Sequence, residues 1–182
     1  MDKKIFNIEN KKLRLRRLLF GAGLVLLSVL QNTDGLFPEI FGVRAMLLIP
    51  AVVCIAMFER ETVGMFFGFF AGILWDMSSS SGGNFNALFL VFTCFVCGSL
   101  ITYLMRNNLV TALLLSSVFT ALHHLVYWLW AIIIKGNADR ALSLFSFYIP
   151  SVIYTVIFLP IFYFAVRAGM KYLNDSATQQ IN

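Results

Sequence analysis

The stretch Gly64–Asp76, GMFFGFFAGILWD, decides the class of fold. It is almost wholly apolar, yet it carries glycine at every fourth position and ends on a carboxylate. Glycine costs a helix in water about 1 kcal/mol relative to alanine, so the spacing needs another explanation. In lipid, burial of apolar surface hardly drives helices together, and small residues four apart let two backbones approach closely. The stretch therefore predicts a packed membrane helix.

The composition favours the same class. Hydrophobic residues make up 59% of the 182 residues and charged residues 13%, whereas a soluble domain carries roughly 25% charge. Because the chain has too few polar residues to cover a surface in water, we expect an all-α, polytopic integral membrane protein, a six-transmembrane-helix bundle. The apolar runs predict spans at 14–33, 41–58, 62–77, 86–105, 109–134 and 146–169.

The basic residues predict the orientation. If the N-terminus is cytoplasmic, the outer side holds Arg44, Lys135 and Arg140. Because basic residues concentrate in cytoplasmic loops, we expect both termini in the cytoplasm. We expect one transmembrane domain at 18–172, between a basic segment at 1–17 and a short polar tail at 173–182. The inner side then holds eleven basic residues: Lys3, Lys4, Lys11, Lys12, Arg14, Arg16, Arg17, Arg60, Arg106, Arg167 and Lys171.

The basic N-terminal segment indicates a partner. Seven Lys or Arg stand in the first 17 residues against Asp2 and Glu9. In front of a membrane span, such a segment favours anionic lipid over nucleic acid, at about 1 kcal/mol per basic residue. The residues expected to contact the lipid surface are Lys11, Lys12, Arg14, Arg16 and Arg17.

The glycine stripe is a candidate interface. Gly64, Gly68 and Gly72, with Ala71 beside them, lie on one side of a helix. They favour packing on another helix of this chain, and a contact with a different membrane protein is the alternative. Asp76 continues the series and precedes a loop rich in turn-forming residues. It can cap the backbone of that loop or contact a ligand or a partner, because ionisable groups in membranes are often functional.

The remaining polar residues suggest no catalytic, cofactor or metal site. Cys94 and Cys97 share a helix face but have no further ligand near them in sequence. His123 and His124 are adjacent, so their side chains diverge by about 100° on a helix. We expect them to be structural, with hydrogen bonds inside the bundle. Without a paired nucleophile and base, we expect no enzyme.

The segment from Leu30 to Leu88 resembles the rod shape-determining protein MreD family of bacterial inner-membrane proteins. The likeness rests on LQNT at 30–33, on Pro38-Glu39, on ERETVGMFFGFFAGILWD at 59–76 and on GGNFNAL at 82–88. Glu39 departs from the more usual Asp, and four serines at 78–81 replace a more mixed loop. The positions that match the motifs are Gln31, Asn32, Thr33, Pro38, Glu39, Asp76, Gly83, Asn86 and Ala87.

The resemblance implies a non-enzymatic scaffold of the cell-elongation (rod) complex, which helps to organise peptidoglycan synthesis and cell shape. It implies MreC as the foremost partner, with MreB, RodA and a class B penicillin-binding transpeptidase in the same complex. The family's fold is also similar to the substrate-binding subunits of energy-coupling-factor vitamin transporters. The alternative function is therefore a solute-binding subunit, with a pocket near Asp76, Asn84 and Asn86. Such subunits use a small-residue stripe on the first span, which is missing here.

Overall fold

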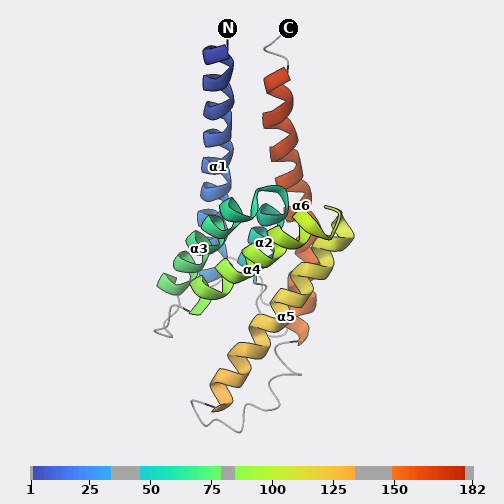
Figure 1. The fold of residues 1–182 in the computed structure, drawn as a ribbon. Coiled ribbons are helices and arrows are strands. Elements are labelled where there is room, and N and C mark those ends of the chain that lie inside the picture. The colour runs from blue at the N-terminus through green and yellow to red at the C-terminus, as the bar shows by residue number, and fades with distance from the viewer. Residues whose placement is uncertain (1, 34–45, 79–84, 134–148, 179–182) are drawn as a thin grey trace.

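The computed structural model describes residues 2–33, 46–78, 85–133 and 149–178, and this part of the chain is all-α (Figure 1). The prediction of an all-α fold is confirmed. Within the described residues the order of helices is α1 (Asp2–Asn32), α2 (Leu48–Phe58), α3 (Glu61–Ser78), α4 (Phe85–Tyr103), α5 (Leu109–Ile133) and α6 (Ile149–Thr178).

The expectation of six transmembrane helices is supported in part. Three helices of the described chain, α4, α5 and α6, are long and apolar enough to cross a membrane. Their spanning stretches are Phe85–Tyr103, Leu109–Leu129 and Pro150–Tyr172. The helix α2 has 11 residues, which reach about 16 Å against the roughly 30 Å of the hydrocarbon core. The apolar run at 41–58 therefore holds a helix shorter than a span, and its residues 41–45 lie outside the described residues.

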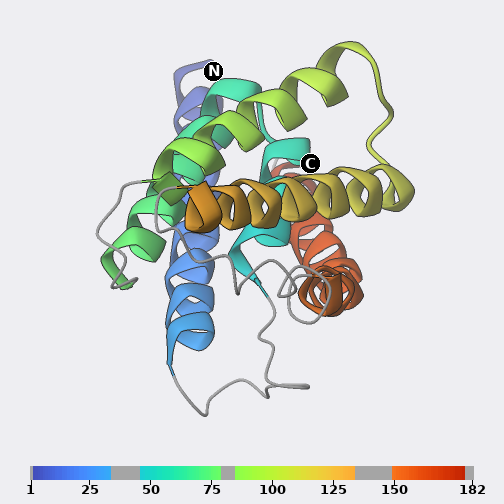
Figure 2. The same cartoon turned by 90° about the horizontal axis from the view of Figure 1, so that it is seen from below.

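The short helix α2 forms the centre of the bundle. Every residue from Leu48 to Met57 is buried, and α2 contacts each of the other five described helices. In the end-on view of Figure 2, α2 lies in the middle of the molecule. A helix that is apolar all round is stable where other helices cover it on every side. Although α2 is too short to cross the membrane, its burial among the other helices stabilises it.

The outer surface of the bundle is apolar. On α5, the large side chains of Leu114, Val118, Leu122 and Leu125 are exposed at successive turns. Such a face would be unfavourable in water, because large contiguous apolar surface is rare on soluble monomers. Lipid around the bundle explains it.

The two ends of the chain lie on the same side of the molecule. The helices α1 and α6 contact each other and project together beyond the bundle (Figure 1). The basic segment 1–17 forms the first part of α1, which runs without a break from Asp2 to Asn32. At the other end of the chain α6 continues to Thr178.

Candidate functional site

The helices α3 and α4 form an antiparallel hairpin in which glycine lets the backbones touch. A β-carbon on Gly68 would lie 2.6 Å from the carbonyl oxygen of Leu90 and 2.8 Å from Cys94 Sγ. One turn further, a β-carbon on Gly72 would collide with the Ala87 backbone. Side chains other than hydrogen therefore do not fit at these two positions.

The same row of contacts continues toward the other end of the hairpin. A β-carbon on Gly64 would lie 3.0 Å from Ala56 Cβ of α2, and one on Gly98 would lie 2.8 Å from Glu61 Cα. Ala71, the fourth residue of the predicted stripe, is fully buried. Of the two partners that the sequence left open, the structure places another part of the same chain against the stripe.

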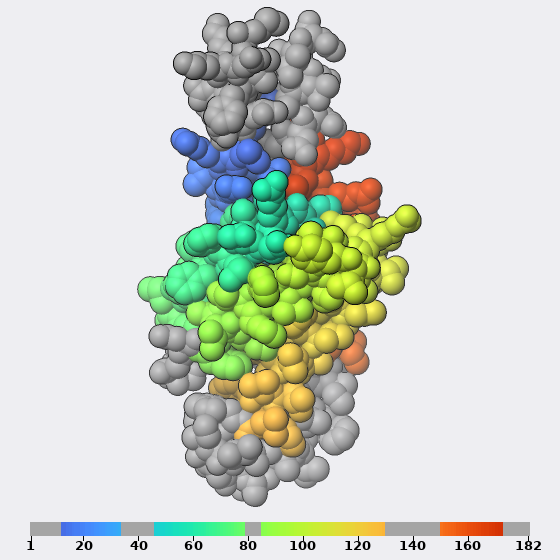
Figure 3. Space-filling model, in the orientation of Figure 1, coloured from blue at the N-terminus to red at the C-terminus, as the bar shows by residue number. Residues whose placement is uncertain are grey.

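The opposite side of the hairpin carries large apolar residues that face outward. We call this surface the hairpin face; α3 and α4 lie toward the viewer in Figure 3. Phe66 is 70% exposed and Met77 81% exposed, so the two sides of α3 differ sharply in packing. The hairpin face consists of Phe66, Phe69, Phe70, Ile73, Met77, Leu88, Phe92 and Phe95.

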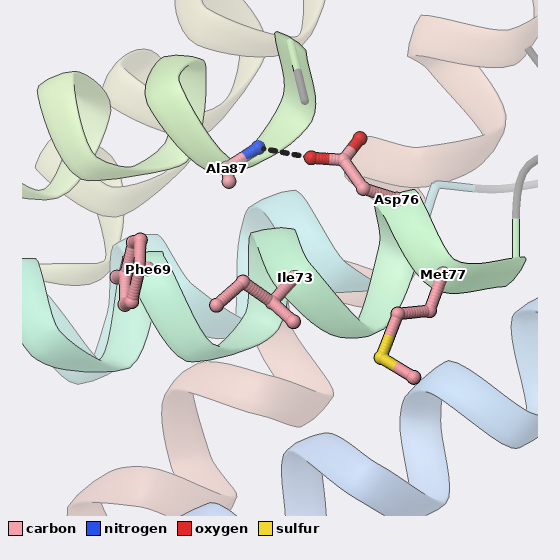
Figure 4. A pocket seen from close by; sticks show the side chains of 5 residues that line it. All are labelled: Phe69, Ile73, Asp76, Met77 and Ala87. Atoms are coloured by element: carbon pink, nitrogen blue, oxygen red, sulfur yellow. Dashed lines mark hydrogen bonds between the residues drawn. The ribbon is translucent and has the colours of Figure 1, made fainter. Parts of the chain in front are cut away.

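Asp76 caps the first turn of α4. Its carboxylate accepts hydrogen bonds from the backbone N–H groups of Asn86, at 3.3 Å, and Ala87, at 2.9 Å (Figure 4). The first N–H groups of a helix have no partner within the helix, and a negative charge there is stabilising. Asp76 thus fixes the start of α4 from across the hairpin, which is the capping role that the sequence left open.

A groove of about 360 Å³ runs along this end of the hairpin. Its walls are Phe69, Ile73, Asp76, Met77 and Ala87, and Figure 4 shows the Asp76 carboxylate turned toward Ala87. The other four side chains of its lining are apolar.

Two histidines of α5 make hydrogen bonds to neighbouring helices. His123 Nε2 lies 2.9 Å from Asn86 Oδ1, and the His123 ring stacks on Trp75 with centroids 5.0 Å apart. His124 Nε2 lies 3.1 Å from Ser151 Oγ. Both rings are buried and hydrogen-bonded inside the bundle, as expected. They link α4 to α5 and α5 to α6.

The first-loop motif lies against the start of α2. Gln31 Oε1 accepts a hydrogen bond from the Leu48 N–H at 3.0 Å, and Asn32 Nδ2 donates to the Ser28 carbonyl oxygen at 2.8 Å. Thr33 is exposed. The other motif positions, Pro38, Glu39 and Gly83, lie outside the described residues, as does Asn84.

Two residues to which the sequence did not point, Thr155 and Asn107, bond the backbone beside the two ends of α2. Thr155 Oγ1 accepts a hydrogen bond from the Met46 N–H at 2.9 Å. Asn107 Nδ2 donates to the Met57 carbonyl oxygen at 2.8 Å. Because both ends of α2 are enclosed by protein, its free backbone groups need such partners. A short apolar helix whose own sequence has no capping residue at either end would have indicated that polar side chains from other helices bond to its ends.

The basic residues of α1 do not behave as one group. Arg16 is buried and pairs with Glu59, with Nη2 and Oε1 2.7 Å apart. The reason is its position one turn before Phe20, whose ring packs on Phe67. Lipid contact by Arg16 is therefore not what the structure shows. Arg14 and Arg17 are exposed, Lys12 is partly buried, and the Lys11 side chain lies outside the described part.

No group of three or more His, Cys, Asp or Glu within the described ranges is placed to hold a metal ion. Cys54, Cys94 and Cys97 are free and buried. The site is therefore made of close helix contacts, caps and hydrogen bonds between helices.

These features define a helical membrane protein whose candidate site is a packed hairpin with a cap at the start of α4. The chain belongs to the MreD family, because the family model for the rod shape-determining protein MreD matches residues 13–173. Comparisons with curated proteins and with solved structures gave no match. The expected likeness to energy-coupling-factor transporter subunits therefore has no support.

Proposed function

We propose that this protein is a non-enzymatic scaffold of the rod complex, which binds MreC in the bacterial inner membrane. Membership of the family carries the general role in determining rod shape. The proposal that the protein binds MreC is supported by the hairpin. Its glycine contacts and the Asp76 cap fix α3 and α4 against each other. A preorganised surface loses little conformational entropy when a partner binds.

The observation that carries the proposal is the pairing of a tight inner side with an apolar outer side. On α3, Gly68 contacts α4 while Phe66 and Phe69 are exposed. A single-span partner can pack its helix on such side chains through van der Waals contact, which is what holds helices together in lipid. We place MreC at the hairpin face.

The exposed basic residues support cytoplasmic termini. Arg60 follows α2 and Arg106 precedes α5, and both are exposed. Exposed Arg14 and Arg17 lie on α1 and exposed Arg167 on α6. These cations suit anionic lipid at the cytoplasmic surface, and MreB would approach this side. We include RodA and the class B transpeptidase as partners only because the chain belongs to the MreD family.

The solute-binding alternative gains no support from the site. Asp76 and Asn86, which it would use to hold a solute, are engaged with each other and with His123. An adjacent groove is mostly apolar.

Mild solubilisation of the tagged full chain, followed by mass spectrometry of what copurifies, tests the scaffold. We expect MreC, together with wall synthases. Recovery of an ATPase module in place of MreC would contradict the scaffold and support transport.

A further inference from the structure

The two sides of α5 differ in an unusual way. Its outward side chains are large and apolar, as at Leu114 and Val118, which are 49% and 52% exposed. Its inward side carries Ser116 and Thr120, both 0% exposed, and His123, 2% exposed. These three residues follow each other at spacings of four and three, so they form one row about 10 Å long on a single helix face.

Each residue of this row has a polar atom without a hydrogen-bond partner among the described residues. The atoms are Ser116 Oγ, Thr120 Oγ1 and His123 Nδ1. Thr93, fully buried on α4, has an unpartnered Oγ1 as well. Buried polar atoms nearly always find a partner in protein or in ordered water.

The neighbouring Ser117 shows how a serine in a helix usually satisfies its hydroxyl group. Its hydroxyl donates to the Leu114 carbonyl oxygen of its own helix at 2.9 Å, a common bond for serine and threonine in helices. Ser116 and Thr120 do not make that bond. Their hydroxyl groups are left to bind something else in the interior.

The hydrogen bond that His123 already makes shows which kind of group can bind to its second ring nitrogen. Its Nε2 faces Asn86 Oδ1, which only accepts, so Nε2 must donate the proton. In the neutral ring the other nitrogen, Nδ1, is then an acceptor. A partner in this row must therefore donate to Nδ1 and exchange hydrogen bonds with hydroxyl groups.

We propose that the inward face of α5 lines an internal water site, in which ordered water molecules bind Ser116, Thr120 and His123 Nδ1. Water both donates and accepts, and it is small enough to follow a row of side chains along one helix. Buried waters commonly make about three hydrogen bonds to groups that are otherwise unsatisfied.

X-ray radiolysis of the full chain in lipid nanodiscs, read by mass spectrometry, tests this proposal. Hydroxyl radicals formed from bound water oxidise the side chains beside it. We expect oxidation of His123 several-fold faster than that of Cys54 and Met57, which are 0% and 3% exposed and lie on the apolar helix α2. Sulfur reacts faster than imidazole with hydroxyl radicals, so faster oxidation of His123 would come from adjacent water and not from the reactivity of the ring. Oxidation of His123 no faster than that of Cys54 and Met57 would overturn the proposal.

Three variants identify the source of the signal. Thr120→Val and Ser116→Ala each remove a hydroxyl group and should lower the oxidation of His123. Ser117→Ala is the matched control and should leave it unchanged, because Ser117 bonds its own helix. If Thr120→Val fails to fold, Ser116→Ala still tests the proposal, because it removes only one oxygen atom. Unchanged oxidation of His123 in Ser116→Ala would contradict the water site.

Discussion

Asp76 Oδ2 lies 2.9 Å from the amide nitrogen of Ala87, and Ala87 is also the residue whose backbone contacts Gly72. One short segment of α4 therefore meets two consecutive turns of α3 in different ways, by steric fit at the glycine and by a charged cap at the carboxylate. The cap fixes the register in which the glycines can fit. The two features of GMFFGFFAGILWD, its glycines and its final aspartate, thus serve the same contact.

Replacement of Gly68 by alanine should destabilise the protein. The new methyl group would lie 2.6 Å from a backbone oxygen, so the helices must separate, at a cost of about 1–3 kcal/mol. Thermal unfolding in detergent measures the loss. Gly23→Ala is the control, because a β-carbon there meets nothing within 4 Å. Equal melting temperatures for Gly68→Ala and the unmodified protein would show that the stripe does not hold the hairpin together.

Replacement of Asp76 by alanine should loosen the start of α4. Loss of a capping side chain costs about 0.5–2 kcal/mol, and the Asn86 and Ala87 amides lose their acceptor. Hydrogen exchange should become faster at these two amides and stay unchanged at the middle of α5. Asp76→Asn keeps one acceptor oxygen and should fall between the two proteins. Unchanged exchange at Ala87 in Asp76→Ala would refute the cap.

The glycine stripe could be predicted from sequence because spacing alone defines a helix face. The helix that it contacts could not, since that depends on how α3 and α4 are aligned. Arg16 shows a second limit: charge pattern treats it like Arg17, yet helical phase turns Arg16 toward Glu59 and leaves Arg17 exposed. Lipid contact was a reasonable prediction for the group and does not fit that one member.

The polar row of α5 could have been found from sequence. Ser116, Thr120 and His123 recur at helical spacing, opposite leucines and valines that face outward. Thr120 lies one turn before His123 and Ser116 two turns before it, which is the spacing that a search for helix faces detects. The short length of α2 was harder to foresee, because the apolar run extends beyond the helix.

Replacement of Arg16 by methionine should be strongly destabilising. It would leave the Glu59 carboxylate, 4% exposed in the pair, without a partner, and breaking a buried pair costs about 3–5 kcal/mol. The double variant Arg16→Met with Glu59→Gln should recover much of this loss, because no buried charge remains. Melting temperatures of the two single variants and the double variant measure the coupling.

The control for this ion pair is Arg17→Met, which removes an exposed cation from the same helix. Surface charges contribute about 0–1 kcal/mol, so its melting temperature should change little. If Arg16→Met and Arg17→Met behave alike, the ion pair does not anchor α1 to the turn between α2 and α3.

Replacement of Phe66 and Phe69 by alanine should weaken the recovery of MreC without unfolding the protein. Both side chains are more than half exposed, at 70% and 51%, so their removal leaves the core intact. A partner helix that packs on them loses van der Waals contact, which is the main attraction between helices in lipid. Leu114→Ala with Val118→Ala is the control, because these residues are similarly exposed on α5. Copurification of MreC, normalised to folded protein, should fall for the first pair and stay constant for the second. A fall for the control pair alone would move the partner from the hairpin face to α5, and no fall for either would remove both surfaces from the proposal.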